Sequence, residues 1–403
     1  MATDASKVFT KPIHEVINYV EVQTALWLRG DEVAVPYIVG VPGIAKTALV
    51  YEMCRKNDWN LLHTHYGLTP HEEVSGMPDF KDVNLIFEGE ERVLPGTMWR
   101  LPDILTKLYK IAENGKPTLW FMDDYHLSSP ALMHLSYEMF TQEIQVVDGV
   151  RQRVPAKLRG YDIPKNVAFV LAGNNSAMAG VKAAFSAVTN RVSMYNVHLD
   201  FQKWKEKYAI PYGVNSKVIN FLSNTNYQSL FIGTESVDPW PSPRSWTRLG
   251  FMLGIIEYNR TPNQDEILYL SSAHVGHKAA ADFASFYSVY SKIDMKSIFD
   301  YKISIEIPSS LLDKYIYMIA STMELVQRVS NKETFTKGVE VFCNILAKMS
   351  EESSEIAVAG LKEVTLYDKS LKLKKLFHTV MAVLRKDYPP QVHQRLIEDV
   401  KII

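Results

Sequence analysis

The sequence predicts an α/β protein: its first half forms a mainly parallel sheet flanked by helices, and its second half is almost entirely helical. Three observations support this fold class. Short apolar runs typical of buried strands alternate with helical patterns up to about residue 200. Beyond that point the patterns over 201–290 and 309–390 are typical of helices. No fixed-period repeat or low-complexity segment interrupts either half.

The elements of the first half follow from local patterns. Residues 12–29 have apolar side chains at helical spacing, and 35–39 form an apolar strand that leads through a glycine-containing turn into a helix over 48–56. The remaining predicted elements are helices over 103–114 and 129–141 and strands over 118–122, 167–172 and 192–199.

Two segments carry strong turn signals. Glycine and proline recur along residues 61–102, which we therefore expect to be irregular. Farther along, Glu143–Val147 and Val150–Val154 flank Asp148-Gly149, which is the strongest short signal for a β-hairpin.

The composition is that of an ordinary globular protein, with 403 residues of which 47% are hydrophobic and 22% charged. The formal net charge of −1 creates no global attraction to nucleic acid or to an anionic membrane, although a local basic patch stays compatible with it. Cys54 and Cys343 form no disulfide framework, which fits a reducing compartment. Because Met1 to Lys11 lack an apolar signal region and no apolar run is long enough to span a bilayer, we expect a cytoplasmic protein without a membrane partner.

A variant of the phosphate-binding Walker A loop lies between the first predicted strand and the next helix. It consists of Gly40, Val41, Pro42, Gly43, Ile44, Ala45, Lys46 and Thr47. Glycines let backbone N–H groups curl around phosphates, Lys46 can place its charge on them, and Thr47 offers a hydroxyl to Mg²⁺. The full pattern has glycine where Ala45 stands. We expect this departure to be mild, because Ala45 lies where the helix begins and a right-handed conformation costs alanine little. A chance Gly-Pro turn is the alternative, and the eight-residue match makes it the weaker one.

Two carboxylates, Asp123 and Asp124, end the predicted strand over 118–122, as in a Walker B motif. In parallel sheets such a strand end lies beside the phosphate loop, so Asp123 would hold Mg²⁺ through its water shell and Asp124 would orient the attacking water. Asp124 stands where glutamate is usual, and its shorter side chain predicts slow hydrolysis. Without the loop, a solvated strand end would explain these acids equally well.

Taken together, these segments resemble the MoxR-like branch of the AAA+ ATPases, whose loop variant also has alanine before the lysine. Further matching segments follow in the family's order: Thr69–Pro78, Val93–Gly96, Ser129-Pro130, Pro164–Asn175, Ala187–Arg191, Pro241–Trp246 and Val275–Ala280. The resemblance covers about residues 12–295. It implies a P-loop AAA+ nucleotide-binding domain over 1–200 with a helix-2 insert and a β-hairpin, a helical lid over 201–295, and a helical C-terminal region over 296–403.

The resemblance also implies ATP with Mg²⁺, a homo-hexameric ring and chaperone-like remodelling of a protein partner, often one with a von Willebrand factor A domain. It places Asn174 at sensor 1, Arg191 at the arginine finger and Arg244 at sensor 2. Physically, Asn174 could hydrogen-bond the attacking water, Arg191 could reach a neighbour's γ-phosphate, and Arg244 could close the lid. The structural alternatives are a turn, a surface ion pair and a helix cap, respectively.

Three histidines, His63, His65 and His71, raise the possibility of a metal site. His63 and His65 would share one face of a strand, but no further ligand spacing follows, so hydrogen-bonding or surface roles are favoured.

Three functions stay open on the sequence: a remodelling ATPase, a nucleotide-dependent scaffold that barely hydrolyses ATP, and a motor acting on DNA. The near-neutral charge argues mildly against the last of these.

Overall fold

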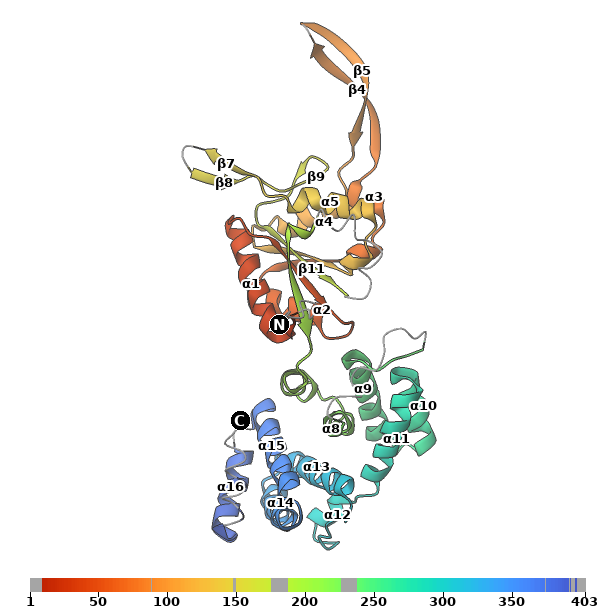
Figure 1. Ribbon diagram of the computed structural model, residues 1–403, viewed down its shortest axis with the longest axis vertical. Coiled ribbons are helices and arrows are strands. Elements are labelled where there is room, and N and C mark those ends of the chain that lie inside the picture. Colours follow the sequence, from red (N-terminus) through yellow and green to blue (C-terminus); the bar gives the residue numbers. More distant parts are fainter. Residues whose placement is uncertain are drawn as a thin grey trace, which may run out of the picture. The chain divides into compact units, whose positions relative to one another are not determined.

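The computed structural model describes residues 9–87, 89–147, 150–174, 188–225, 238–373, 375–390, 392 and 396. The chain folds as two compact units, Met1–Asp200 and Phe201–Ile403 (Figure 1). Each unit has its own core. The finer division of the second unit at residue 295 stays a prediction.

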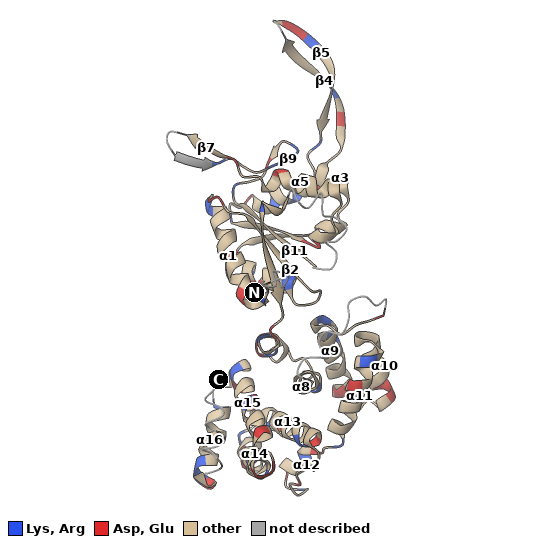
Figure 2. Ribbon diagram, in the orientation of Figure 1, with Lys and Arg blue, Asp and Glu red and all other residues tan. Residues whose placement is uncertain are grey.

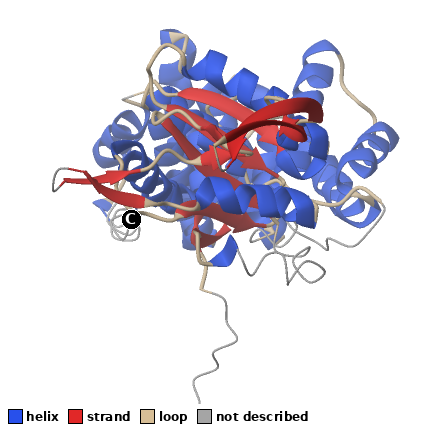
Figure 3. Ribbon diagram, turned by 90° about the horizontal axis from the view of Figure 1, so that it is seen from above, coloured by secondary structure: helices blue, strands red, loops and turns tan. Residues whose placement is uncertain are grey.

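A six-stranded, all-parallel sheet forms the centre of unit 1 (red in Figure 3). Its strands, in spatial order, are β1 (Lys11–Pro12), β12 (Val192–His198), β2 (Val35–Gly40), β11 (Val167–Gly173), β6 (Thr118–Asp123) and β3 (Asn60–His65). Every residue of β2, β6 and β11 is buried, which is why these strands have continuous apolar sequences. Because all strands run the same way, their carboxyl ends meet at one edge of the sheet.

Helices cover this sheet. They are α1 (Ile13–Arg29), α2 (Lys46–Lys56), α3 (His71–Ser75), α4 (Asp103–Ala112) and α5 (Pro130–Phe140), with the short 3₁₀ turns η1 (Tyr66–Leu68) and η2 (Tyr125–Leu127). Helix α1 buries Val20 and Trp27, and the Trp27 ring packs edge-on against Phe169 of β11. Burying each such side chain stabilises the folded state by about 1.5–3 kcal/mol.

The expectation that 61–102 is irregular was wrong. Strand β3 occupies its start, and β4 (Pro78–Phe87) pairs antiparallel with β5 (Glu90–Trp99) in a long hairpin that extends from the unit (Figure 1). Strand β3 is an outermost strand of the sheet, so most of its side chains are only partly buried and its sequence mixes two leucines with polar residues. Among the described residues the hairpin pairs with no third strand, and a two-stranded ribbon tolerates the proline and glycine that suggested loops.

A second hairpin occurs where the sequence predicts one. Strands β7 (Ile144–Val147) and β8 (Val150–Arg153) pair antiparallel, while the predicted turn residues Asp148-Gly149 lie outside the described residues. The two-residue strands β9 (Lys157–Leu158) and β10 (Tyr161–Asp162) form a further small ribbon.

Unit 2 is helical, as predicted. Its helices are α7 (Phe201–Trp204), the π-helix η4 (Lys205–Ala209), α8 (Ser216–Asn224), α9 (Pro243–Asn259), α10 (Gln264–Val275), α11 (His277–Ser291), α12 (Met295–Phe299), α13 (Leu311–Arg328), α14 (Lys332–Glu352), α15 (Ser354–Ser370) and α16 (Leu376–Asp387). One apolar core joins residues from Met295 to Leu396.

The parallel sheet of unit 1, its covering helices and the helical second unit together confirm the predicted fold class, a P-loop α/β module followed by helices. Within the described parts of both units, no helix combines the length and apolarity needed to cross a bilayer.

Candidate nucleotide site

The predicted phosphate loop follows the carboxyl end of β2. Its first residue has no room for a side chain, because a Cβ atom on Gly40 would lie 2.7 Å from Val197 and 2.8 Å from Ile44. Gly43 has a φ of 78°, in the left-handed region that glycine adopts freely. Helix α2 starts at Lys46, so the loop leads directly into a helix N-terminus. Free N–H groups and the helix dipole favour the binding of an anion there.

Ala45 corrects one expectation. It does not lie in the right-handed conformation but has φ 75° and ψ 23°, the left-handed region, immediately before α2. This conformation costs an L-residue roughly 1–2 kcal/mol. The loop therefore keeps the conformation that glycine would adopt at this position, and the backbone of Ala45 is strained.

The Lys46 side chain lies buried inside the loop. Its ammonium group donates to the carbonyls of Gly40, at 2.8 Å, and Val41, at 3.1 Å, and to Oδ1 of Asn174, at 2.9 Å. Asn174 directly follows β11, the strand beside β2. The predicted sensor 1 residue and the loop lysine, 128 positions apart, are thus in direct contact.

Thr47 and Asp123 form the second contact of the site. The Thr47 hydroxyl donates to Oδ2 of Asp123 at 2.6 Å, and the Asp124 amide donates to Oδ1 of Asp123 at 3.0 Å. Burial raises the pKa of Asp123, but contacts with His63, Thr47 and the Asp124 amide outweigh it and lower that pKa to about 2. Asp123 is therefore a carboxylate at neutral pH, as a divalent cation requires.

Asp124 lies next to this pair in an unusual backbone conformation, with φ 53° and ψ 29°. Aspartate tolerates the left-handed region better than most residues, and such conformations cluster at functional sites. Oδ2 of Asp124 lies 3.2 Å from Nδ1 of His65, at the end of the neighbouring strand β3. The carboxyl group is partly exposed, so water can reach it.

Two histidines of β3 contact the acidic pair, which the sequence did not predict. His63 contacts Asp123, and His65 contacts Asp124, because β3 pairs with β6 in a register that sets His63 beside Phe121 and His65 beside Asp123. The spacing of two residues on one strand was a usable signal. The pairing of that strand with the acidic strand was not visible in the sequence.

Arg191 lies at the opposite edge of the sheet. It directly precedes β12, whose Val192 pairs with the first residue of β2, whereas the phosphate loop follows the last. The length of β2, at about 3.3 Å per residue, therefore separates Arg191 from the phosphate loop by roughly 16 Å. The guanidinium stacks on the Tyr137 ring, with its carbon 3.6 Å from the ring centroid, and donates to the Thr141 hydroxyl at 2.9 Å. Arg191 is thus not brought to the loop of its own chain.

Arg244, the predicted sensor 2 residue, belongs to unit 2. It is exposed in the first turn of α9, just after the Ser242 cap and Pro243. Ser242 and Ser245 form a reciprocal capping box that fixes the start of this helix. The role of Arg244 stays a prediction.

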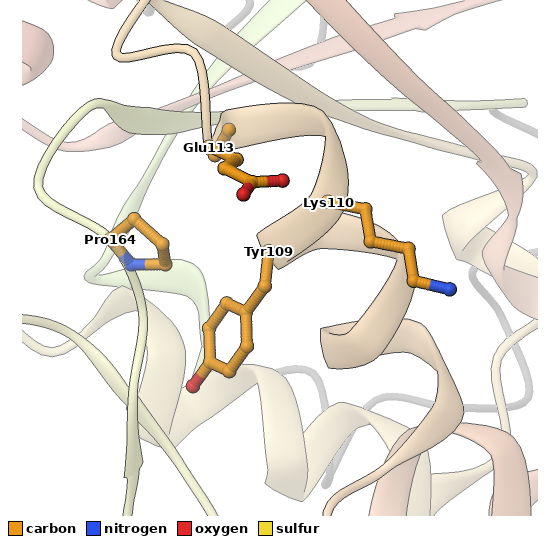
Figure 4. A pocket seen from close by; sticks show the side chains of 5 residues that line it. Tyr109, Lys110, Glu113 and Pro164 are labelled. Carbon is orange, nitrogen blue, oxygen red and sulfur yellow. The ribbon is translucent and has the colours of Figure 1, made fainter.

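A surface hollow of about 400 Å³ also lies at the sheet edge away from the loop (Figure 4). Tyr109, Lys110, Ala112 and Glu113, at the end of α4, line it together with Pro164, which precedes β11. It is shallow and shares no residue with the loop, so it is a different feature from the site.

The groups gathered at the carboxyl edge of the sheet fit a nucleoside triphosphate with Mg²⁺. The fit rests on a loop without room for a first side chain, a buried ammonium group beside it, and a hydroxyl–carboxylate pair of the oxygen type that Mg²⁺ prefers.

No family model matches this sequence, and no curated protein matches it. Among solved structures, similarity extends to RuvB of Thermotoga maritima, described in one structure as a Holliday junction branch migration motor. That structure is 14% identical with a TM-score of 0.29, covering 72% of this chain and 76% of its own. Two mutant forms of the same protein have TM-scores of 0.31 and 0.32 at 13% and 15% identity; they cover 72% and 73% of this chain and 76% and 79% of their own. At these scores the likeness supports no conclusion about function.

Proposed function

We propose that this chain binds and hydrolyses ATP at the carboxyl edge of its sheet. The observation that carries the proposal is the pair of contacts Lys46–Asn174 and Thr47–Asp123 around a glycine loop at a helix N-terminus. Three separate strand ends, those of β2, β6 and β11, supply these groups, and a chance arrangement would not bring them together.

Each residue has a role that follows from its chemistry. The loop backbone would cradle the phosphates, with the Lys46 ammonium on the β- and γ-phosphates. Thr47 and Asp123 would hold Mg²⁺, which neutralises phosphate charge when bound. Asp124 would orient the attacking water, and the Asn174 amide would hydrogen-bond that water or the γ-phosphate.

The position of Arg191 is compatible with a proposed ring. At the sheet edge away from its own loop, its guanidinium is placed where it could stabilise developing charge at a neighbouring subunit's nucleotide. We therefore propose a homo-hexamer with shared sites, of the MoxR-like type, that remodels a protein partner. A partner with a von Willebrand factor A domain fits that type.

The β4–β5 hairpin favours a protein partner over DNA. Phe80, Ile86 and Val93 are 80%, 76% and 63% exposed, a degree of apolar exposure typical of contact surfaces. Residues 78–99 contain five acidic and two basic residues, and Figure 2 shows acidic positions on β5. This negative charge would repel phosphate backbones.

A second candidate, a scaffold that binds ATP but hydrolyses it slowly, is favoured by Asp124. Its side chain is shorter than glutamate, and His65 already contacts its Oδ2 atom. A water molecule would have to compete with that contact. Steady-state turnover separates the two candidates, and stimulation by DNA would revive the third.

The decisive test is Lys46→Ala. Removing a charge-assisted contact predicts at least about a tenfold loss of ATP affinity, measured by calorimetry. Lys110→Ala, an exposed lysine at the opposite sheet edge, is the matched control and should bind as the parent does. Thermal melting checks that both variants fold. Equal affinity in Lys46→Ala and the parent would refute the proposed site.

A further inference from the structure

We infer that His63, His65 and Asp123 form a binding site for a first-row transition-metal ion such as Zn²⁺ or Co²⁺, distinct in chemistry from a magnesium site. One ligand atom of each residue lies within 4.8 Å of the other two. Two imidazoles and one carboxylate are a ligand set that zinc accepts and magnesium avoids. The inference goes beyond the proposed ATPase function and does not depend on it.

The distance between His63 and Asp123 fits a bridging metal better than a hydrogen bond. Nε2 of His63 lies 3.5 Å from Oδ2 of Asp123, and within the described part of the chain this buried nitrogen makes no hydrogen bond. Zinc bonds of about 2.0–2.1 Å at a tetrahedral angle place two ligand atoms about 3.3–3.4 Å apart. The observed spacing is thus close to that of two ligands on one ion.

The surroundings of His63 resemble those of a metal ligand. Its Nδ1 lies 2.9 Å from the Tyr51 hydroxyl, and its ring stacks on Phe121 with the centroids 5.1 Å apart. In the tautomer that binds a metal through Nε2, Nδ1–H donates to Tyr51, and this second contact holds the ring in place. Tyr51 is therefore a positioning residue for the site.

His65 supplies the third ligand and the route of entry. Its side chain is 59% exposed, and its ring centroid lies 4.8 Å from that of His63. A modest rotation of this exposed ring completes a three-residue site, and water fills the remaining position, as in open zinc sites. A metal bound here would occupy Oδ2 of Asp123, an oxygen of the carboxylate that the proposed magnesium site uses, so it would also inhibit nucleotide turnover.

The test uses the purified full chain without nucleotide, titrated with Co²⁺ and followed by visible absorption, and with Zn²⁺ followed by calorimetry. One equivalent should bind in the presence of a large excess of Mg²⁺. His63→Ala and His65→Ala should each weaken binding at least about tenfold, and Tyr51→Phe about tenfold, the range seen for partners of metal ligands. His71→Ala is the matched control, since His71 bonds Ser75 on α3 and should leave binding unchanged.

Parent-like binding in both His63→Ala and His65→Ala, or an equal loss in His71→Ala, would overturn the inference. Because no nucleotide is present, failure of ATP binding leaves this result unaffected. In a second measurement, Zn²⁺ should inhibit ATP turnover of the parent more than that of His63→Ala, each relative to its own metal-free rate.

Discussion

The two edges of the same sheet use polar side chains differently. At the carboxyl edge they contact one another: Lys46 with Asn174, Thr47 with Asp123 and His65 with Asp124. At the opposite edge, two asparagine amides bond to backbone carbonyls, and Asn60 donates in addition to the side chains of Asn114 and Thr118. The Asn60 amide donates to the Ile111 carbonyl, and the Asn166 amide donates to those of Ala112 and Lys116.

This difference suggests that side chains at the carboxyl edge serve ligand binding and that those at the opposite edge serve stability. The paired side chains at the carboxyl edge can exchange each other for a ligand, because water or phosphate can take the place of the lost partner. Where the acceptor of such a bond is partly buried, as at the carbonyls of Ile111 and Ala112, removing the donor leaves that acceptor unpaired. Substitutions at the carboxyl edge should therefore change turnover or binding, and those at the opposite edge should change stability, with Arg191 as the informative exception.

The largest effect is expected at Asp124. Asp124→Asn should abolish ATP turnover and keep ATP affinity, since the neutral amide no longer polarises water while Asp123 still serves the metal. Asparagine also tolerates the left-handed backbone, so the fold should survive. Turnover at the parent's rate, in an assay of phosphate release, would show that Asp124 has no such role.

Arg191 tests whether the opposite edge acts in another subunit. Arg191→Ala should bind ATP almost normally but lose hydrolysis, because the neighbour's phosphate loses its cation. Lys46→Ala and Arg191→Ala subunits, each inactive alone, should regain partial activity when mixed, provided that they exchange between rings. If Arg191 only stacks on Tyr137, its loss should cost about 1 kcal/mol of stability and leave turnover unchanged.

The sequence predicted the parts that depend on local patterns. The continuous apolar runs of β2, β6 and β11 identified the sheet centre, and the loop and its following helix identified the candidate phosphate site. Strand β3 and the β4–β5 hairpin were missed because neither buries a full apolar face.

The rest of the site depends on pairings between distant segments. The contacts of His63 and His65 with the acidic strand follow from the β3–β6 register, which no short spacing encodes. The left-handed backbone of Ala45 was also hidden, because the residue type argued for the opposite conformation. Contact between Lys46 and Asn174 could be anticipated, since both follow parallel strands whose ends share an edge.

At the opposite edge, Asn166→Ala should lower stability without changing ATP affinity. It removes two hydrogen bonds, of 3.1 and 2.7 Å, to the carbonyls of Ala112 and Lys116. Because water can replace the exposed bond to Lys116, mainly the partly buried bond to Ala112 counts, and the loss should be roughly 0.5–1.5 kcal/mol, visible as a lower urea midpoint. Lys165→Ala, the exposed neighbour, should stay within about 0.5 kcal/mol of the parent. A loss of ATP affinity in Asn166→Ala would contradict the separation of the two edges.

The smallest effect is expected at Ala45, inside the phosphate loop itself. Its left-handed backbone costs about 1–2 kcal/mol that glycine would not incur, but glycine adds about 0.4–1 kcal/mol of unfolded-chain entropy. Ala45→Gly should therefore stabilise unit 1 by about 1 kcal/mol or less. Ala48→Gly, at an exposed position of α2 three residues farther along, should destabilise it by about 0.5–1 kcal/mol, because there the backbone is helical. If urea unfolding shows that Ala45→Gly raises the free energy of unfolding and Ala48→Gly lowers it, the strain at Ala45 is established. If both substitutions lower it, Ala45 lies in the right-handed region. ATP affinity of Ala45→Gly, measured alongside, then tells whether that strain serves binding: if it pre-shapes the loop, the more flexible glycine variant should bind more weakly although it is more stable.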